Sequence, residues 1–567
     1  MLALAPAAAR AGGTAGTTSA ITTVPSTSTV VDPNTPVLVT KVNRPPAGYR
    51  LTAVQVERIA AQSPKIKDEL RRHPTAIPYE YTKGPGRWQV SWFSIGHPQV
   101  ELAQVYVDDA TGTITEAWTG FQVAWTMARG YPGAFGRRVN AWYVWIPMCL
   151  LFVAPFIPWR RRPSLLHLDL LVLLGFSISL AFFNRAEIGL SVPLAYPFLL
   201  YLLARMLLLA FGRGLPREPL RLLVPASWLA VAVVFLVGFR VGLNVTNSNV
   251  IDVGYAGVIG ATKVLHGEHL YGGYPSNNAN GDTYGPVNYY AYVPARAIFG
   301  WSGIWDNLPA AHAAAIAFDL LTLMGLYFLG RRIRGPTLGI VLAYAWAAYP
   351  FSLYVLSSNS NDSLVAMLAV LALLLIRSAP GRGIAGALGA LTKFAPLALA
   401  PLLLRGEGDW PRKRSLVVCA LAFVLTTVVV MLPVLTENNL HAFWHDTISY
   451  QAQRGSPFSI WGLWGGLGFA QHLVQGAAGG LALMVAFVPR RRDVVTVAAL
   501  AAAVVIALQL GVTHWFYLYI VWFFPLVIVA VFGAHPERVG ALDLATRPRV
   551  LARAPELSPE PASARSL

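Results

Sequence analysis

The sequence predicts a polytopic α-helical membrane protein with about 11–12 transmembrane helices, preceded by a small extracytoplasmic α+β domain. Of the 567 residues, 55% are hydrophobic and only 13% are charged, whereas a soluble protein carries roughly 25% charged residues. Apolar segments long enough to cross a bilayer recur from residue 141 onward. A region with helical and alternating patterns precedes them.

Two different compositions divide the chain before its first apolar segment. Residues 1–49 are rich in Ala, Thr, Ser, Pro and Val and carry little charge, so we expect a disordered segment. Residues 50–135 predict a small α+β domain. It begins with a helical pattern over 53–72, which Pro64 is expected to break into two short helices. Alternating apolar and polar residues then predict strands at 87–95, 100–107 and 113–119.

The turn between the last two predicted strands contains Asp108 and Asp109, which favour a hairpin. The run VYVDDATGTITEAW (105–118) resembles the strand–turn–strand of PepSY-type domains, which occur in extracytoplasmic and membrane-linked proteins. A generic small domain would explain the same pattern, and both interpretations stay open.

The chain from residue 141 to 533 is dominated by apolar segments. We interpret 141–221 as three additional transmembrane helices and 222–533 as one membrane module with a large loop at 244–307. The polar, Pro- and Ala-rich tail at 534–567 is expected to be disordered. The predicted spans are 141–158, 165–183, 191–211, 222–242, 308–330, 337–356, 361–376, 416–435, 466–488, 494–512 and 515–533.

Basic residues in the short connections predict the topology. Cytoplasmic connections carry an excess of Lys and Arg, and such clusters occur at 159–164, 212–221, 331–336, 377–382, 405–415 and 489–493. The net charge of +17 therefore indicates membrane orientation rather than a nucleic-acid partner. The loop at 244–307 is then extracytoplasmic and the C-terminal tail cytoplasmic. Because four spans separate this loop from the N-terminal domain, the two lie on the same side.

One apolar segment breaks this alternation. Residues 383–404 have a basic connection on both sides, so a single crossing would place one of them outside. The segment also contains Lys393, followed by Pro396 and Pro401, which remove helix donors. We therefore predict a broken or re-entrant hairpin with both ends cytoplasmic. An ordinary kinked span that locally violates the charge rule is the alternative.

Polar residues on the predicted outer side form the candidate site. Asp252 follows the fourth span and opens the aromatic-rich loop, and a carboxylate held near a bilayer is costly unless it is used. Cations gathered in an outward-facing cavity would stabilise a departing lipid phosphate. Ordinary interfacial polar residues are the alternative for each member taken singly. The candidate binding residues are Lys393, Tyr284, Asn361, Asp362, His441, His445, Arg454 and His514.

No metal site or disulfide is predicted. Only His441 and His445 have the i, i+4 spacing of helical metal ligands, and we interpret them as interfacial histidines. The two cysteines, Cys149 and Cys419, lie within apolar segments and are expected to be small core residues.

Four segments from 222 to 533 resemble the C-type (GT-C) superfamily of membrane glycosyltransferases. They are IDVGYAGVIGATKVLHGEHLYG (251–272), YGPVNYYAYVP (284–294), YPFSLYVLSSNSNDSLVAMLAVLALLL (349–375) and GRGIAGALGALTKFAPLALAPLLL (381–404). Their order and spacing are most similar to the polyprenyl-phosphate-mannose-dependent, actinobacterial branch. The chain departs from the superfamily in two respects. The next acid after Asp252 is Glu268 rather than a close neighbour, and the N-terminal domain and first three spans lie outside the resemblance.

This resemblance implies a glycosyltransferase that moves mannose or a related pentose from a polyprenyl-phosphate donor to a lipid or cell-envelope glycan. Asp252 matches the position of the catalytic Asp and is expected to be the general base of an inverting transfer. Beyond this lipid-linked donor, no cofactor is expected. Lys393→Ala is expected to weaken donor binding more than folding. The N-terminal domain is expected to modulate acceptor access, or to contact an envelope protein, rather than to catalyse.

Two other function classes explain part of the pattern. A transporter or flippase of a lipid-linked envelope precursor would share the many spans, the broken helix and the midplane Lys393. It would not explain the asymmetric aromatic loop, and the halves show no inverted repeat. A membrane sensor using the N-terminal domain would leave the outer polar cluster without a role.

Overall fold

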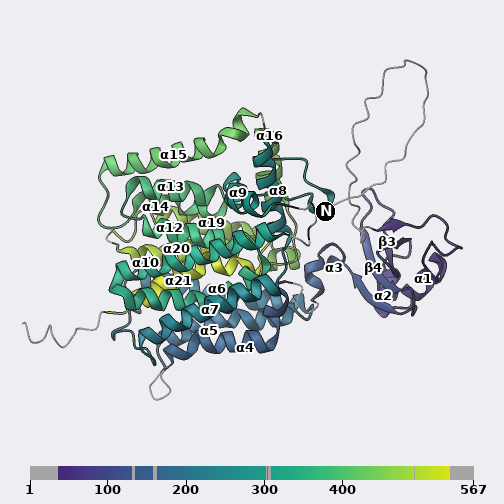
Figure 1. The fold of residues 1–567 in the computed structure, drawn as a ribbon, viewed down its shortest axis with the longest axis horizontal. Helices are drawn as coiled ribbons and strands as arrows, with labels where there is room; N and C mark the ends of the chain where they lie inside the picture. The colour runs from purple at the N-terminus through teal and green to yellow at the C-terminus, as the bar shows by residue number, and fades with distance from the viewer. Residues whose placement is uncertain are drawn as a thin grey trace, which may run out of the picture.

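The computed structural model describes residues 36–130, 135–157, 163–301, 303, 305, 308–437, 439–490 and 492–536. The greater part of the two segments predicted to be disordered, 1–35 and 537–567, lies outside the described residues. Figure 1 shows a small sheet-containing unit beyond one end of a larger helical bundle.

The small unit is an antiparallel sheet covered on one face by two helices. Its five strands pair in sequence order. Trp88, Val90 and Val105 alternate onto the covered face, where they pack with Val56 and Ile66. The elements are β1 (Val37–Leu38), α1 (Ala53–Ala60), α2 (Pro64–Arg72), β2 (Ile77–Thr82), β3 (Arg87–Phe93), β4 (Glu101–Asp108) and β5 (Ile114–Thr119).

The two predicted helices and three predicted strands are confirmed, but the unit is larger than the sequence pattern indicated. Pro64 divides the pattern into two helices as predicted, and it is the first residue of α2, where proline has no N–H to leave unpaired. Strand β2 was missed because Pro78 interrupts its pattern. The unit also starts before residue 50, because β1 pairs with β2 and the Tyr49 ring packs edge-on against Trp88 at 5.2 Å.

The bundle consists of long apolar helices. Among the described residues, six helices are long and apolar enough to cross a membrane. The longer bundle helices are α4 (Trp142–Val153), α5 (Leu165–Phe183), α6 (Ile188–Ala210), α7 (Ala226–Thr246), α10 (Pro309–Ala348), α11 (Pro350–Ser358), α12 (Asp362–Leu374), α13 (Ala379–Ala390), α15 (Lys413–Thr436), α19 (Gly468–Met484), α20 (Val494–Gly511) and α21 (Ile520–Gly533). The short helices there are η2 (Arg137–Asn140), η3 (Ala154–Phe156), η5 (Ala395–Leu399), α14 (Ala400–Arg405), α18 (Ile460–Leu463) and η7 (Tyr517–Tyr519).

Helix α10 contains two of the predicted spans. Arg334 and Gly335 have non-helical backbone angles, and Gly335 adopts a φ of 78° that favours glycine. After this break the chain packs back on itself, because a Cβ built on Gly330 would lie 2.7 Å from the Cα of Gly339. The pair of helices predicted at 308–330 and 337–356 therefore corresponds to the two halves of α10, with α11 completing the second.

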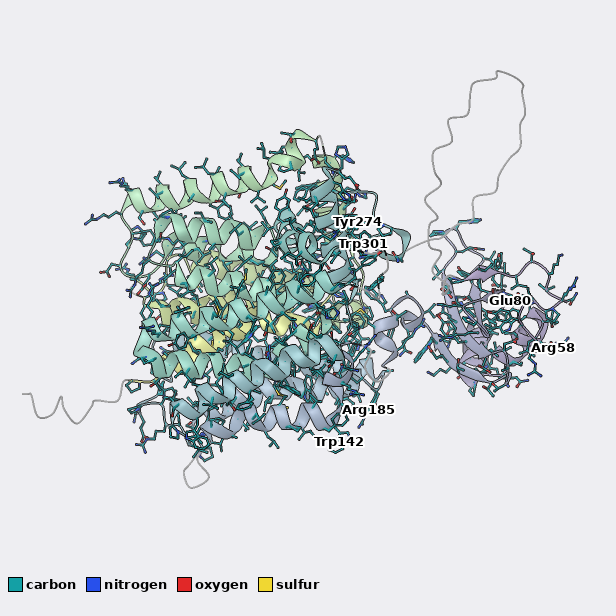
Figure 2. All side chains as sticks on the ribbon, in the orientation of Figure 1. Arg58, Glu80, Trp142, Arg185, Tyr274 and Trp301 are labelled. Carbon is teal, nitrogen blue, oxygen red and sulfur yellow. The ribbon has the colours of Figure 1, made fainter. Side chains whose placement is uncertain are left out.

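The connections gather at two opposite ends of the bundle, as the predicted alternation requires. At the end that faces the small unit, here called the outer end, the backbone N–H of Gly136 donates to Asn249 Oδ1 at 2.5 Å. The backbone N–H of Asn249 donates to the carbonyl of Ser357 at 3.2 Å. Figure 2 shows Arg185 and Tyr274 at this same end. Which side of the membrane the outer end faces stays a prediction.

Residues 383–404 form a broken element that returns to the end from which it starts. Helix α13 stops at Ala390, and the chain continues through η5 into α14. Arg377, before α13, forms an ion pair with Glu407, after α14, at 2.9 Å. The Arg382 guanidinium also donates to the carbonyl of Leu404 at 3.4 Å. The prediction of a re-entrant hairpin is confirmed in its geometry, while the cytoplasmic position of its ends stays a prediction.

The large loop folds into helices at the outer end. These are α8 (Asp252–His266), η4 (Ser276–Asn278) and α9 (Pro286–Phe299). The aromatic composition of this loop predicts tyrosines at the membrane interface, but Tyr255, Tyr271, Tyr289 and Tyr292 are buried in a core of their own. The Tyr289 hydroxyl donates to the carbonyl of Gly281 at 2.8 Å, which offsets its burial. The buried Tyr292 hydroxyl has no hydrogen-bond partner among the described residues.

Candidate active site

Asp252 is the first residue of α8, and packing against the α11–α12 turn fixes its position. The backbone N–H of Ile251 donates to the carbonyl of Ser358 at 3.2 Å. A Cβ on Gly254 would lie only 2.2 Å from the carbonyl oxygen of Asn359, so only glycine permits this approach. On the other side, Asn278 Nδ2 donates to the Asp252 carbonyl at 2.9 Å.

The Asp252 carboxyl is exposed, yet much of its surroundings is protein rather than water. Burial by these surroundings raises its pKa above the ordinary value for aspartate. The charges of Arg454 and Lys393 oppose this shift, and the charge of Asp362 adds to it. Asp252 is therefore electrostatically coupled to three of the charged residues that the sequence analysis grouped with it.

Lys393 and Asp362 form a buried ion pair next to Asp252. Lys393 Nζ lies 2.6 Å from Asp362 Oδ1. The same carboxyl group accepts from Trp522 Nε1 at 2.8 Å and from the Ser360 hydroxyl at 2.7 Å. Asp362 thus has its lone pairs occupied from three directions, which is how a carboxylate is tolerated away from water. The turn of the re-entrant hairpin brings Lys393 to this partner.

Aromatic rings surround the Lys393 ammonium group. Its Nζ lies 5.0 Å from the ring centre of Trp522, 5.4 Å from that of Tyr284 and 5.5 Å from that of Tyr519. These distances fit cation–π attraction. Tyr284 reaches this position because the next residue, Gly285, lies directly on the hairpin. A Cβ on Gly285 would lie 2.0 Å from the carbonyl oxygen of Leu391.

Arg454 and His514 lie on the wall of the same cavity. The Ser456 hydroxyl lies 2.9 Å from His514 Nδ1. Burial lowers the pKa of His514 well below its usual range, and the charges of Arg454 and Lys393 act in the same direction. His514 is therefore a neutral hydrogen-bonding group in this site, while Arg454 and Lys393 supply the positive charge.

Lys393, Tyr284, Arg454 and His514 line a cavity of about 370 Å³ with two chemically different ends, whereas Asp252 and Asp362 are not among its lining residues. The outer part is lined by Tyr284, Lys393, Arg454, His514 and Tyr519. The remainder passes between α12, α13, η5 and α20, where most of the lining is apolar and Gln475 and Gln509 are polar exceptions. Its apolar residues are Val365, Leu368, Ala369, Ala372, Ala385, Leu399, Leu403, Val505 and Leu508.

The remaining candidates from the sequence lie elsewhere. His441 and His445 are exposed on α16 (Leu440–Phe443) and η6 (Trp444–Ser449), and neither lines the cavity. His445 Nδ1 instead lies 2.7 Å from Asp446. Asn361 is buried and donates to Asn288 Oδ1 at 2.7 Å, which is a packing contact. The structure therefore does not bring these three residues to the cavity lining, and their role in binding stays a prediction.

Two further acids, Glu268 and Asp319, each lie close to a basic side chain other than those of the candidate site. Glu268, the next acid in the sequence after Asp252, is exposed and lies 3.5 Å from His266. The acid coupled to Asp252 is instead Asp362, which is 110 residues away in the chain. The intramembrane Asp319 pairs with the buried Arg240 and accepts from Trp346 Nε1 at 2.9 Å. No group of three or more potential metal ligands occurs among the described residues.

Several residues of the site were missed in the sequence. Tyr519 and Trp522 belong to the run WFYLYIVWFF (515–524), whose composition indicates only a membrane span. Ser456 and Trp125 stand in connections without any motif. The Trp125 ring lies 5.6 Å from the His514 ring and 5.3 Å from the Arg454 guanidinium. Only the folded chain brings them together.

Part of the bundle is similar to a known protein family. Residues 283–533 match the model of glycosyltransferase family 87, from Thr283 in the outer loop to the end of α21. The small unit, α4 to α7 and Asp252 lie outside this segment. A search of the curated proteins found no significant match. The family match and the long apolar helices together indicate a membrane glycosyltransferase.

Proposed function

We propose that the protein transfers a sugar from a polyprenyl-phosphate donor to a lipid or cell-envelope glycan on the extracytoplasmic face of the cell membrane. One observation carries the proposal: the cavity joins a cationic, aromatic outer part to an apolar passage between helices. A polyprenyl-phosphate sugar has the matching chemistry, with a phosphate between a long apolar chain and a polar sugar. A nucleotide sugar would leave the apolar passage without an occupant.

The two cations are suited to the phosphate. Lys393 and Arg454 both line the cavity, and positive charge held in place before the reaction stabilises the negative charge that develops on a departing phosphate. Lys393 is held at 2.6 Å from Asp362, so its position does not depend on the donor. The rings of Tyr284 and Trp522 flank it and restrict its movement further.

The chemistry is a single displacement with Asp252 as the general base. The Asp252 carboxylate takes the proton from an acceptor hydroxyl, and that oxygen attacks the anomeric carbon of the sugar. The bond between the anomeric carbon and the phosphate oxygen breaks, and the polyprenyl phosphate leaves with the electron pair. One displacement inverts the anomeric centre. The raised pKa of the Asp252 carboxyl suits this role, since a base is most effective when its pKa approaches the working pH.

The sugar in this proposal is mannose or a related pentose, and no resident cofactor takes part. The exposed position of Asp252 at the outer end leaves room for a large acceptor. Membrane lipids, the lipid-linked donor and the acceptor are the proposed partners, with an envelope protein as a further partner of the small unit.

The proposal is tested with the purified full-length protein in lipid nanodiscs. Radiolabelled polyprenyl-phosphate mannose and polyprenyl-phosphate arabinose are each offered with an envelope glycan extract, and GDP-mannose serves as the comparison donor. We expect labelled glycan from a lipid donor and none from GDP-mannose. Transfer from GDP-mannose alone would overturn the choice of donor. Movement of labelled lipid between leaflets of proteoliposomes without any transfer would instead identify a flippase.

A further inference from the structure

The connection between the small unit and the bundle is fixed at both of its ends. It contains α3 (Phe121–Ala124) and η1 (Thr126–Arg129). On the side of the small unit, the buried Arg129 donates to Gln104 Oε1 on β4 at 2.6 Å, and within the connection it donates to the carbonyl of Gln122 at 2.9 Å. On the bundle side, Gly130 lies so close to the 185–186 connection that a Cβ would be 2.2 Å from Ala186 N. A segment held in this way has little freedom to move.

Trp125 stands between α3 and η1 and packs on the wall of the cavity. Its ring lies 5.3 Å from the ring of Phe458 in an edge-on arrangement and 5.6 Å from the ring of His514. The Arg454 guanidinium carbon lies 5.3 Å from its ring centre. Trp125 therefore contacts both cavity-lining residues, Arg454 and His514, although it is not on the cavity surface itself.

Arg454 depends on this ring for its position. Among the residues that the structure describes, no carboxylate lies within ion-pair distance of its guanidinium group, and its Nε is buried without a hydrogen-bond partner. The guanidinium carbon instead lies 5.3 Å from the ring centre of Trp125 and 5.9 Å from that of Tyr450. Lys393, in contrast, has Asp362 as a direct partner.

We infer that Trp125 is a positioning residue for the donor phosphate: it holds Arg454 at the cavity wall by cation–π contact. The inference rests on the proposed function and adds a part of the site that lies outside the matched segment 283–533. It also makes the small unit a support of the site, because the Arg129 contacts anchor the segment that carries Trp125.

The test measures binding of tritiated polyprenyl phosphate, without sugar, to the full-length protein in nanodiscs. We compare Trp125→Ala, Trp125→Phe and the control Trp142→Ala, whose ring is 73% exposed. We expect Trp125→Ala to weaken binding about tenfold, which corresponds to about 1.4 kcal/mol and lies within the range of a desolvated cation–π contact. Trp125→Phe, which retains a ring, and Trp142→Ala should stay within about threefold of the unchanged protein.

A double-mutant cycle decides whether Trp125 acts through Arg454. In an Arg454→Gln background, Trp125→Ala should cause no further loss of binding, because the cation that it positions is gone. An equal loss in both backgrounds, or no loss in either, would overturn the inference. If the unchanged protein itself failed to bind polyprenyl phosphate, the proposed function would fail, and the inference with it. Thermal unfolding of each variant separates these results from misfolding, and Trp125→Phe keeps the test valid if Trp125→Ala does not fold.

Discussion

Lys393 Nζ lies 2.6 Å from Asp362 Oδ1, and both side chains are buried. The lysine comes from the turn of the re-entrant hairpin and the aspartate from the first turn of α12. Lys393 and Asp362, which the sequence analysis names only as separate candidate binding residues, thus form one ion pair. The ammonium group is held in place before any donor arrives, and it still lines the cavity.

This pair changes the expected effect of Lys393→Ala. Removal of the lysine leaves a buried carboxylate without its cation, which costs about 3–5 kcal/mol of unfolding free energy. We therefore expect a clear loss of thermal stability together with the loss of donor binding, rather than mainly a binding defect. Thermal unfolding in detergent measures the first and polyprenyl-phosphate binding the second. Asp362→Asn combined with Lys393→Met should recover much of the stability but none of the binding. Unchanged stability in Lys393→Ala would contradict the pairing.

Transfer should depend on pH through Asp252. Burial raises the pKa of this carboxyl, and a general base works only when it is deprotonated. The rate should therefore fall as the pH is lowered through a pKa above the ordinary aspartate value. Because the fold disfavours the charged carboxylate, the stability that Asp252 contributes is present at low pH and is lost as the pH rises through that pKa.

Two measurements check this prediction. The pH profile of kcat/KM should have an acid limb above the range of ordinary aspartates, and Asp252→Asn should be at least as stable at neutral pH as the unchanged protein. An acid limb at or below the ordinary value, or a large loss of stability in Asp252→Asn, would contradict the assignment.

Gly285 is predicted to be essential for the position of Tyr284. A Cβ at this residue would lie 2.0 Å from the carbonyl oxygen of Leu391, so Gly285→Ala must push the outer loop away from the hairpin. We expect a strong loss of donor binding, with Tyr284 displaced from the Lys393 ammonium group. Gly238→Ala is the matched control, because nothing lies within 4 Å of a Cβ there. Equal activity of the two variants would show that the loop does not dock as described.

The helices of the bundle could be predicted from the sequence because each depends on the composition of one continuous segment and its flanks. Apolar length located the spans, and two basic flanks with Pro396 and Pro401 located the hairpin. The environment of the loop tyrosines could not be predicted, since a tyrosine suits a membrane interface and a hydrogen-bonded core equally well. Trp125 could not be found either, because its contact with Arg454 joins residues 329 positions apart through the packing of two units.

The orientation in the membrane is tested by labelling cysteines in whole cells. Ala279 lies exposed in the outer loop and Lys413 lies exposed at the start of α15, at the opposite end of the bundle. In a background with Cys149→Ser and Cys419→Ser, we expect Ala279→Cys to react with an impermeant maleimide and Lys413→Cys to react only after lysis. The reverse pattern would place the cavity mouth on the cytoplasmic side.

The central claim is that Asp252 is the general base of a transfer from a lipid-linked sugar, and Asp252→Asn tests it most directly. Transfer from radiolabelled polyprenyl-phosphate sugar and binding of polyprenyl phosphate are measured on the same nanodisc preparation. The account predicts that Asp252→Asn binds the lipid as the unchanged protein does and transfers no detectable sugar. Near-normal turnover by this variant, with normal binding, would contradict it.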